Sequence, residues 1–203
     1  QQGVDHGFGR YNSNRHVRIM SVHGNSNSNE RDGRVAADGD LKGGSVLQSL
    51  FIFDDIFGDG PGKIPRGSRI KSATLRFKVT NQGDAPVLFQ MATAWDAGQL
   101  TFEGAKLNGN TSPGIQADDT EAFVSPATQM PHGLLGIVEV DVSEHLQKWV
   151  DGRENFGWVL RAAGSNAWGA EGIDVESKAD RPLLNVEYEP LSQGRKPRKT
   201  QRF

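Results

Sequence analysis

The sequence of 203 residues contains no cysteine. Disulfide bonds, zinc sites built on thiolates and cysteine nucleophiles are therefore excluded. Long hydrophobic runs are also missing: the longest, such as residues 50–53, fall far short of the ~20 apolar residues of a membrane-spanning helix. The His-Glu-x-x-His motif of zinc proteases and the Gly-x-Ser-x-Gly motif of serine hydrolases do not occur. Without a catalytic motif, the sequence favours a protein that is not an enzyme.

Hydrophobic residues, counted without glycine, make up 35%. Glycine is plentiful, with 25 residues. Helical bundles tolerate little glycine in their interiors, so this composition favours many short strands joined by tight turns. Asp-Gly or Asn-Gly pairs, which tolerate the positive φ of tight turns, occur at 32–33, 38–39, 59–60, 108–109 and 151–152. The sequence therefore predicts an all-β protein.

Several segments show the alternation of half-buried antiparallel strands. Apolar residues occupy every second position over 73–79, 138–142 and 184–188. A shorter alternating segment predicts a strand over 16–22. Residues 46–53 are apolar on both faces and predict a central strand. The asparagine- and serine-rich tract 25–29 predicts a loop.

One short helix is expected near 143–151. Leu146, Trp149 and Val150 recur at helical spacing and give one apolar face. Ser143 is a candidate N-cap, and the pair at 151–152 ends the helix. Trp149 on this helix and Trp158 on an alternating strand are predicted to be core residues.

The charges are nearly balanced overall but unevenly distributed. Lys and Arg total 23 and Asp and Glu total 25, with a pI of about 6.2, which argues against a general nucleic-acid-binding protein. Residues 191–203 hold five basic residues and no acid, so the remainder has 18 basic against 25 acidic residues, a net charge of −7. We therefore expect an N-terminal arm (1–15), a β-domain (16–190) and a basic tail (191–203).

The basic tail is the candidate for self-association. Its residues are Arg195, Lys196, Arg198, Lys199, Arg202 and Phe203. The last residues can add to an exposed sheet edge, with Phe203 filling a pocket. The cations would favour the approach of one copy's tail to the acidic body of another copy. Such a head-to-tail contact builds rings or open filaments.

Two acidic clusters occur in the sequence. Asp54, Asp55 and Asp59 surround a glycine-rich turn where carboxylates can bind calcium, although turn-capping aspartates give the same pattern. Asp118, Asp119 and Glu121 are interpreted as a solvated loop. No cofactor is required, and calcium is the one cation that the sequence suggests.

Two tryptophans outside the predicted core are candidate platforms for sugar rings. Trp168 lies in a loop-like segment and is the first candidate, the alternative being a residue that covers the edge of the core. Trp95 ends a strand and is intermediate. The segment Asn110-Thr111-Ser112 is a formal glycosylation sequon, meaningful only in a secreted protein.

The order of these motifs resembles the DNRLRE domain, an extracellular bacterial module related to alginate-type carbohydrate-binding modules. The motifs are SLFIFD (49–54), IPRGSRIKSATL (64–75), WD (95–96), VDVS (140–143), LQKWVDG (146–152), NFGW (155–158), Glu176 and RPLLNVEY (181–188). The resemblance spans roughly residues 16–190. It implies a jelly-roll β-sandwich without catalytic activity, a ligand face near Trp95 and Glu176, and a fold that accommodates calcium.

Two functions follow from these observations. The first is an extracellular structural subunit that associates with copies of itself into a filament or surface layer. The alternative is a carbohydrate-binding module that recognises an (acidic) polysaccharide. The sequence begins at Gln1, which fits either the removal of a signal peptide or a start chosen for expression. We expect a secreted or cell-surface protein without a membrane span.

Overall fold

The structure is a computed structural model, which describes residues 4–5, 10–11, 14–22, 26–30, 34–39, 46–103, 107–191 and 199–203. The strands are β1 (Val4–Asp5), β2 (Arg10–Tyr11), β3 (Asn14–Val22), β4 (Ser26–Glu30), β5 (Arg34–Gly39), β6 (Val46–Phe53), β7 (Arg69–Gln82), β8 (Val87–Met91), β9 (Ala122–Gln129), β10 (Gly136–Asp141), β11 (Trp158–Arg161), β12 (Trp168–Glu171), β13 (Leu183–Glu189) and β14 (Lys199–Arg202). The helices are the 3-10 turns η1 (Leu107–Gly109) and η2 (Lys178–Asp180) and the α-helix α1 (Ser143–Val150).

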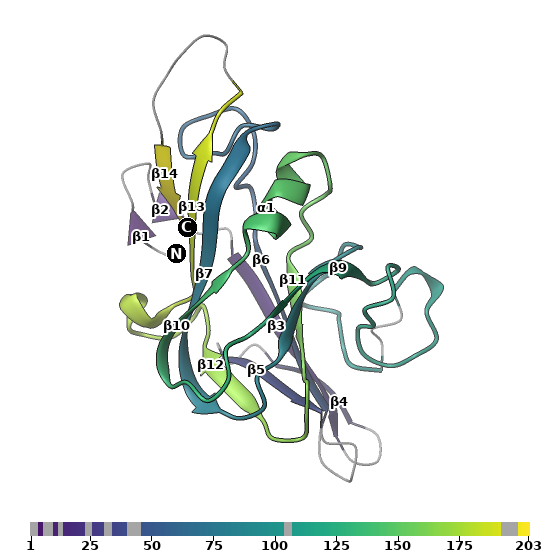
Figure 1. Cartoon of the computed structure of the whole chain (residues 1–203). Coiled ribbons are helices and arrows are strands. Elements are labelled where there is room, and N and C mark those ends of the chain that lie inside the picture. The colour runs from purple at the N-terminus through teal and green to yellow at the C-terminus, as the bar shows by residue number, and fades with distance from the viewer. Residues whose placement is uncertain are drawn as a thin grey trace.

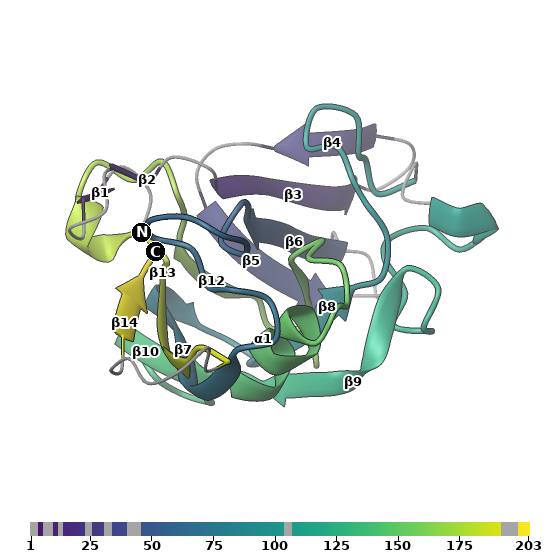
Figure 2. The same cartoon turned by 90° about the horizontal axis from the view of Figure 1, so that it is seen from above.

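Twelve of these strands form one curled sheet (Figures 1 and 2). Its path runs β14-β13-β7-β12-β5-β6-β11-β8-β9, with β10 added to β7 and the β3–β4 pair added to β6. Every pairing between the described strands is antiparallel. The sheet curls into a half-barrel that encloses the core, so the all-β prediction is confirmed. The finer jelly-roll assignment stays a prediction.

The alternating segments bury the faces that the sequence indicated. Ala73, Leu75, Phe77 and Val79 of β7 are all buried, and the corresponding residues of β10 and β13 are buried with them. Trp149 and Trp158 lie at the centre of this main core, with ring centroids 4.5 Å apart. Both tryptophans are therefore core residues, as predicted.

Strand β6 is buried on both faces, which confirms the prediction of a central strand. Phe51 and Phe53 point into the main core. Leu50 and Ile52 point the other way, into a smaller apolar cluster that also contains Trp95, Leu100, Phe102 and Ile115. The loops between β8 and β9 cover this second cluster. One strand thus separates two cores.

The predicted helix is present as α1, Ser143–Val150, but its N-cap differs from the prediction. The N-cap position is Val142, and no side chain caps the helix from there. Asp141 instead accepts a hydrogen bond from the Ser143 N–H at 2.7 Å. The Ser143 hydroxyl accepts the Ala73 N–H at 2.8 Å and so ties α1 to β7. Among the described residues no helix is long and apolar enough to cross a membrane.

The prediction of a loop over 25–29 is wrong, because β4 occupies Ser26–Glu30. Its backbone pairs with β3, from Arg18 opposite Glu30 to Val22 opposite Ser26. Among the described strands β4 has β3 as its single neighbour, so it is an edge strand. Backbone hydrogen bonds to one neighbour can hold such a strand without an apolar face. The polar composition of this segment therefore led to the wrong prediction of a loop.

The tail adds a strand to a sheet edge, as predicted, but it does so within one chain. Strand β14 pairs with β13, with Thr200 opposite Glu187 and Arg202 opposite Asn185. Phe203 lies in the main core, with 3% of its surface exposed. Arg202 is exposed. Arg195, Lys196 and Arg198 lie outside the described residues.

Candidate functional site

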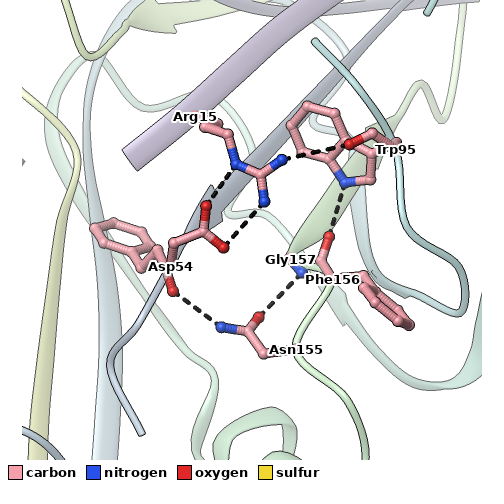
Figure 3. A network of polar contacts seen from close by, with 7 residues as sticks. Arg15, Asp54, Trp95, Asn155, Phe156 and Gly157 are labelled. Atoms are coloured by element: carbon pink, nitrogen blue, oxygen red, sulfur yellow. Dashed lines mark hydrogen bonds and ion pairs between the residues drawn. The ribbon is translucent and has the colours of Figure 1, made fainter. Parts of the chain in front are cut away.

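A pocket of about 230 Å³ opens beside the end of β6. Its lining residues are Arg15, Ile52, Asp54, Ala94, Trp95, Asn155 and Phe156. Arg15 comes from β3, Ile52 from β6 and Asp54 from the position directly after β6. Two loops supply the other lining residues. Figure 3 shows Arg15, Asp54, Trp95 and Asn155 arranged around this hollow. The pocket therefore combines apolar walls with three polar side chains, which is the usual make-up of a small-ligand site.

Arg15 and Asp54 form a two-pronged ion pair at the pocket. The Nε atom of Arg15 lies 2.5 Å from one carboxylate oxygen and Nη2 lies 3.0 Å from the other. The side chains remain 47% and 31% exposed, respectively. The guanidinium also lies 5.6 Å from the centre of the Trp95 ring, within the range of a cation–π contact. A ligand can thus reach a fixed donor and a fixed acceptor side by side.

Trp95 forms an apolar wall that is fixed in place. Its indole N–H donates to the Phe156 carbonyl at 2.8 Å, and its own carbonyl lies 3.4 Å from Nη1 of Arg15. The ring is mostly buried in the smaller cluster, against Ile52 among others. Only a small part of the ring therefore faces a ligand.

Asn155 holds the remaining wall against β6. Its Nδ2 donates to the Phe53 carbonyl at 2.9 Å, and its Oδ1 accepts the Gly157 N–H at 3.0 Å. Gly157 has φ +78°, and a Cβ there would lie 2.2 Å from the Phe51 carbonyl oxygen. Since only glycine fits this approach, the loop that carries Phe156 is set close against the strand.

The structure brings two predicted residues together, Asp54 and Trp95, although the sequence assigned them to different ligands. Asp54 faces Arg15 instead of the other predicted calcium ligands. Asp55, at φ +58°, pairs with Lys63 at 2.5 Å, and Asp59 lies in the turn that follows. Among the residues that the structure describes, no three acidic or histidine side chains gather closely enough to hold a metal ion.

The assignment of Trp168 as a sugar platform is corrected by its burial. Trp168 lies on β12 with 2% of its surface exposed, and its ring packs edge-on against Phe77 at 6.0 Å. A ring enclosed in this way presents no face for stacking, so Trp168 is a core residue. Glu176 is exposed and does not line the pocket.

Sequence reasoning missed Arg15, Asn155 and Phe156. Arg15 was placed at the end of an arm, whereas it lies within β3, where Arg15 is paired with Ile52. No local pattern links it to Asp54, which is 39 positions away. Asn155 and Phe156 belong to the NFGW motif, which is part of the resemblance but gives no sign of a pocket.

The prediction of a solvated acidic loop is wrong for one of its three residues. Asp118 and Asp119 are exposed, but Glu121 is fully buried. Its carboxylate accepts hydrogen bonds from the N–H groups of Leu107 and Gln116 at 2.9 and 2.8 Å. Burial raises the pKa of Glu121, and these bonds oppose that shift. The loop before β9 therefore folds around a carboxylate.

The sequon residue Asn110 belongs to the same network. Its Nδ2, the atom that a glycan would modify, donates to Asp118 at 2.9 Å and to Glu121 at 3.0 Å. Glycosylation would replace one of the two amide hydrogens and so remove at least one of these bonds. The structure therefore gives Asn110 a role in holding the loop.

No family model matches the chain, and no curated protein shows significant similarity to it. The resemblance to the DNRLRE domain therefore stays a prediction.

Proposed function

We propose that the protein is a non-catalytic carbohydrate-binding domain and that the Arg15–Asp54 pocket takes one sugar residue of a polysaccharide. The observation that carries this proposal is the exposed, two-pronged ion pair beside an aromatic wall. Neighbouring sugar hydroxyls both donate and accept hydrogen bonds. A carboxylate accepts and a guanidinium donates, so a fixed pair of the two matches a vicinal diol.

The size and polarity of the pocket support a small, hydroxylated ligand. Its volume of about 230 Å³ lies below the ~300–1,000 Å³ of pockets for drug-sized ligands, which suits a single sugar ring. Trp95 and Phe156 offer apolar edges for the C–H groups of that ring. Because the charges of Arg15 and Asp54 offset each other, hydroxyl groups are the primary target, and a carboxylate sugar would have to compete with Asp54 for Arg15.

The β-rich fold and the sequence resemblance support the same role. Residues 16–190, which resemble an extracellular carbohydrate-binding module, include Asp54, Trp95 and Asn155 of the pocket. A polysaccharide ligand also fits the expected location outside the cell. We place this role ahead of self-association because the described residues of a single chain form the pocket.

Binding to a panel of neutral and acidic polysaccharides tests the proposal, measured by calorimetry or affinity electrophoresis. We expect Asp54→Asn and Arg15→Lys each to weaken binding at least ~10-fold, because each disrupts a charge-assisted hydrogen-bond pair worth about 1.5–3 kcal/mol. Glu189→Gln is a matched control, since Glu189 forms a partly exposed ion pair with Lys71 at 3.0 Å outside the pocket. Equal affinities for all three variants, or no binding to any glycan, would refute the proposal.

A further inference from the structure

Strand β10 forms an open edge of the sheet. Among the described strands its single neighbour is β7, and it lies at the margin of the molecule (Figure 2). The Val142 N–H, which continues this pairing, donates to the Ala73 carbonyl at 2.9 Å. Backbone groups alternate in direction along a strand, so the second and fourth residues before Val142 also bond towards β7. Ile137 and Glu139 therefore direct their N–H and C=O groups to the other side, where no described strand lies.

The side chains at the start of this edge are apolar and accessible. Ile137 is 50% exposed. Leu134 and Leu135, which lead into the strand, are 49% and 60% exposed. Between them and Ile137, Gly136 has no side chain, and a Cβ built there would meet nothing within 4 Å. The first half of β10 therefore combines backbone groups that face no described strand with an accessible apolar surface.

The other three edge strands among the described residues carry features that discourage the addition of a further strand. Strand β4 consists of Ser, Asn and Glu residues, β9 contains Pro126 and a break in its register with β8, and β14 carries Lys199 and Arg202. Strand β10 has neither a proline nor a basic residue. Its Glu139 is paired in register with Arg76 of β7, so this carboxylate has an opposite charge beside it in the same chain. A regular, apolar edge of this kind is a template for pairing with another strand.

We infer that β10 is the interface of a two-fold dimer, in which the β10 strands of two copies pair antiparallel and join their sheets. Two-fold pairing places one residue of β10 opposite its own copy. With Glu139 at this position two carboxylates would meet, which is destabilising, and with Val138 each Ile137 would face a carboxylate. With Ile137 at this position the two exposed isoleucines meet, and their outward backbone groups form a hydrogen-bonded pair.

The edge is therefore complementary to itself when Ile137 lies on the two-fold axis, and a second copy of the chain is its partner. The residues that line the Arg15–Asp54 pocket do not include any residue of β10 or of the segment that leads into it. The inference is thus independent of the proposed function, and its test needs no glycan.

A single cysteine at position 137 tests the interface and its register. The sequence has no cysteine, so the full chain with Ile137→Cys has one thiol. Cα atoms of a hydrogen-bonded antiparallel pair are about 5.5 Å apart, within the ~4.4–6.8 Å range of disulfides. Val124→Cys on β9 is the matched control, because Val124 is 49% exposed and Ile137 is 50% exposed.

Both variants are oxidised under mild conditions and followed by non-reducing electrophoresis. We expect Ile137→Cys to form covalent dimers at least ~10-fold faster than Val124→Cys, because association holds its two thiols at a high effective concentration. Equal rates for the two variants would refute the interface, since they would mean that random collision accounts for both crosslinks.

The unsubstituted chain gives a second measurement that does not depend on cysteines. Analytical ultracentrifugation over about a hundredfold range of concentration should show a dimer fraction that grows with concentration. Ile137→Lys would set two ammonium groups opposite each other and should weaken dimerisation at least ~10-fold, whereas Val124→Lys should leave it unchanged. A chain that stays monomeric at every concentration, or dimers that both substitutions weaken equally, would overturn the inference.

Discussion

His145 on α1 is buried in its neutral form, and this makes the stability of the protein sensitive to mild acid. Only 1% of its surface is exposed. Its Nδ1 accepts the indole N–H of Trp158 at 2.9 Å, and its Nε2 lies 3.0 Å from the hydroxyl of Thr128. Because an indole N–H can only donate, Nδ1 carries no proton. Protonation would place a second N–H against that of Trp158.

The environment of His145 lowers its pKa from 6.5 to about 4. Burial is the main cause, the nearby charge of Arg153 adds to it, and Asp141 opposes it. Between these two pKa values the unfolded chain binds a proton that the folded chain does not. Stability is therefore lost as the pH falls from 6.5 towards 4. At 1.36 kcal/mol per pKa unit, the loss between pH 7 and pH 4 is about 3 kcal/mol.

Urea unfolding of the wild type and of His145→Asn between pH 7 and pH 4 measures this effect. An asparagine oxygen can still accept from Trp158 but does not titrate. We expect the variant to be less stable at pH 7, through lost packing, and the wild type to lose about 3 kcal/mol more than the variant by pH 4. The raised pKa of Glu121 acts in the opposite direction, but it is present in both proteins and cancels in the difference.

His132→Asn is the matched control, because His132 is exposed and its ring stays in water in both states. The free energy of unfolding of His132→Asn should change with pH in parallel with that of the wild type. Parallel curves for His145→Asn and the wild type would refute the reasoning, since they would mean that the buried imidazole binds its proton as readily in the folded state as in the unfolded one.

Two further predictions concern packing, and thermal or urea unfolding measures both. Trp168→Ala should destabilise the fold by about 3–5 kcal/mol, as expected for a buried tryptophan; a change below about 1 kcal/mol would mean that the ring is dispensable to the core. Gly157→Ala should lower the free energy of unfolding by at least ~2 kcal/mol more than Gly133→Ala does. Both glycines have positive φ, but only a Cβ at 157 would meet a backbone oxygen, at 2.2 Å. Equal costs would show that the close approach to Phe51 relaxes easily.

The strands and the helix could be predicted because burial repeats along the chain with the period of each element. The four alternating apolar residues of β7 are buried, and the apolar face of α1 packs on the core. Strand β6 was predicted to be central for the same reason. A backbone pairing without an apolar face leaves no such trace, which is why β4 was taken for a loop.

The pocket could not be predicted, because it depends on contacts between distant segments. The pairing of β3 with β6 places Arg15 beside Asp54, and composition near Arg15 indicated only an arm. Glu121 was misjudged for a related reason. A carboxylate in a polar loop looks solvated in sequence, whereas backbone donors from Leu107 and Gln116 allow it to be buried.

The division of the interior by β6 separates the aromatic centre of the main core from the walls of the Arg15–Asp54 pocket. Trp95 and Ile52 of the pocket belong to the smaller cluster, and the main core lies on the other face of the strand. Residues of the loops over the smaller cluster can therefore be exchanged with little disturbance to the aromatic centre around Trp158. The β8–β9 loops, which supply Ala94 and Trp95, are therefore a region in which the shape of the pocket can be varied on an unchanged scaffold.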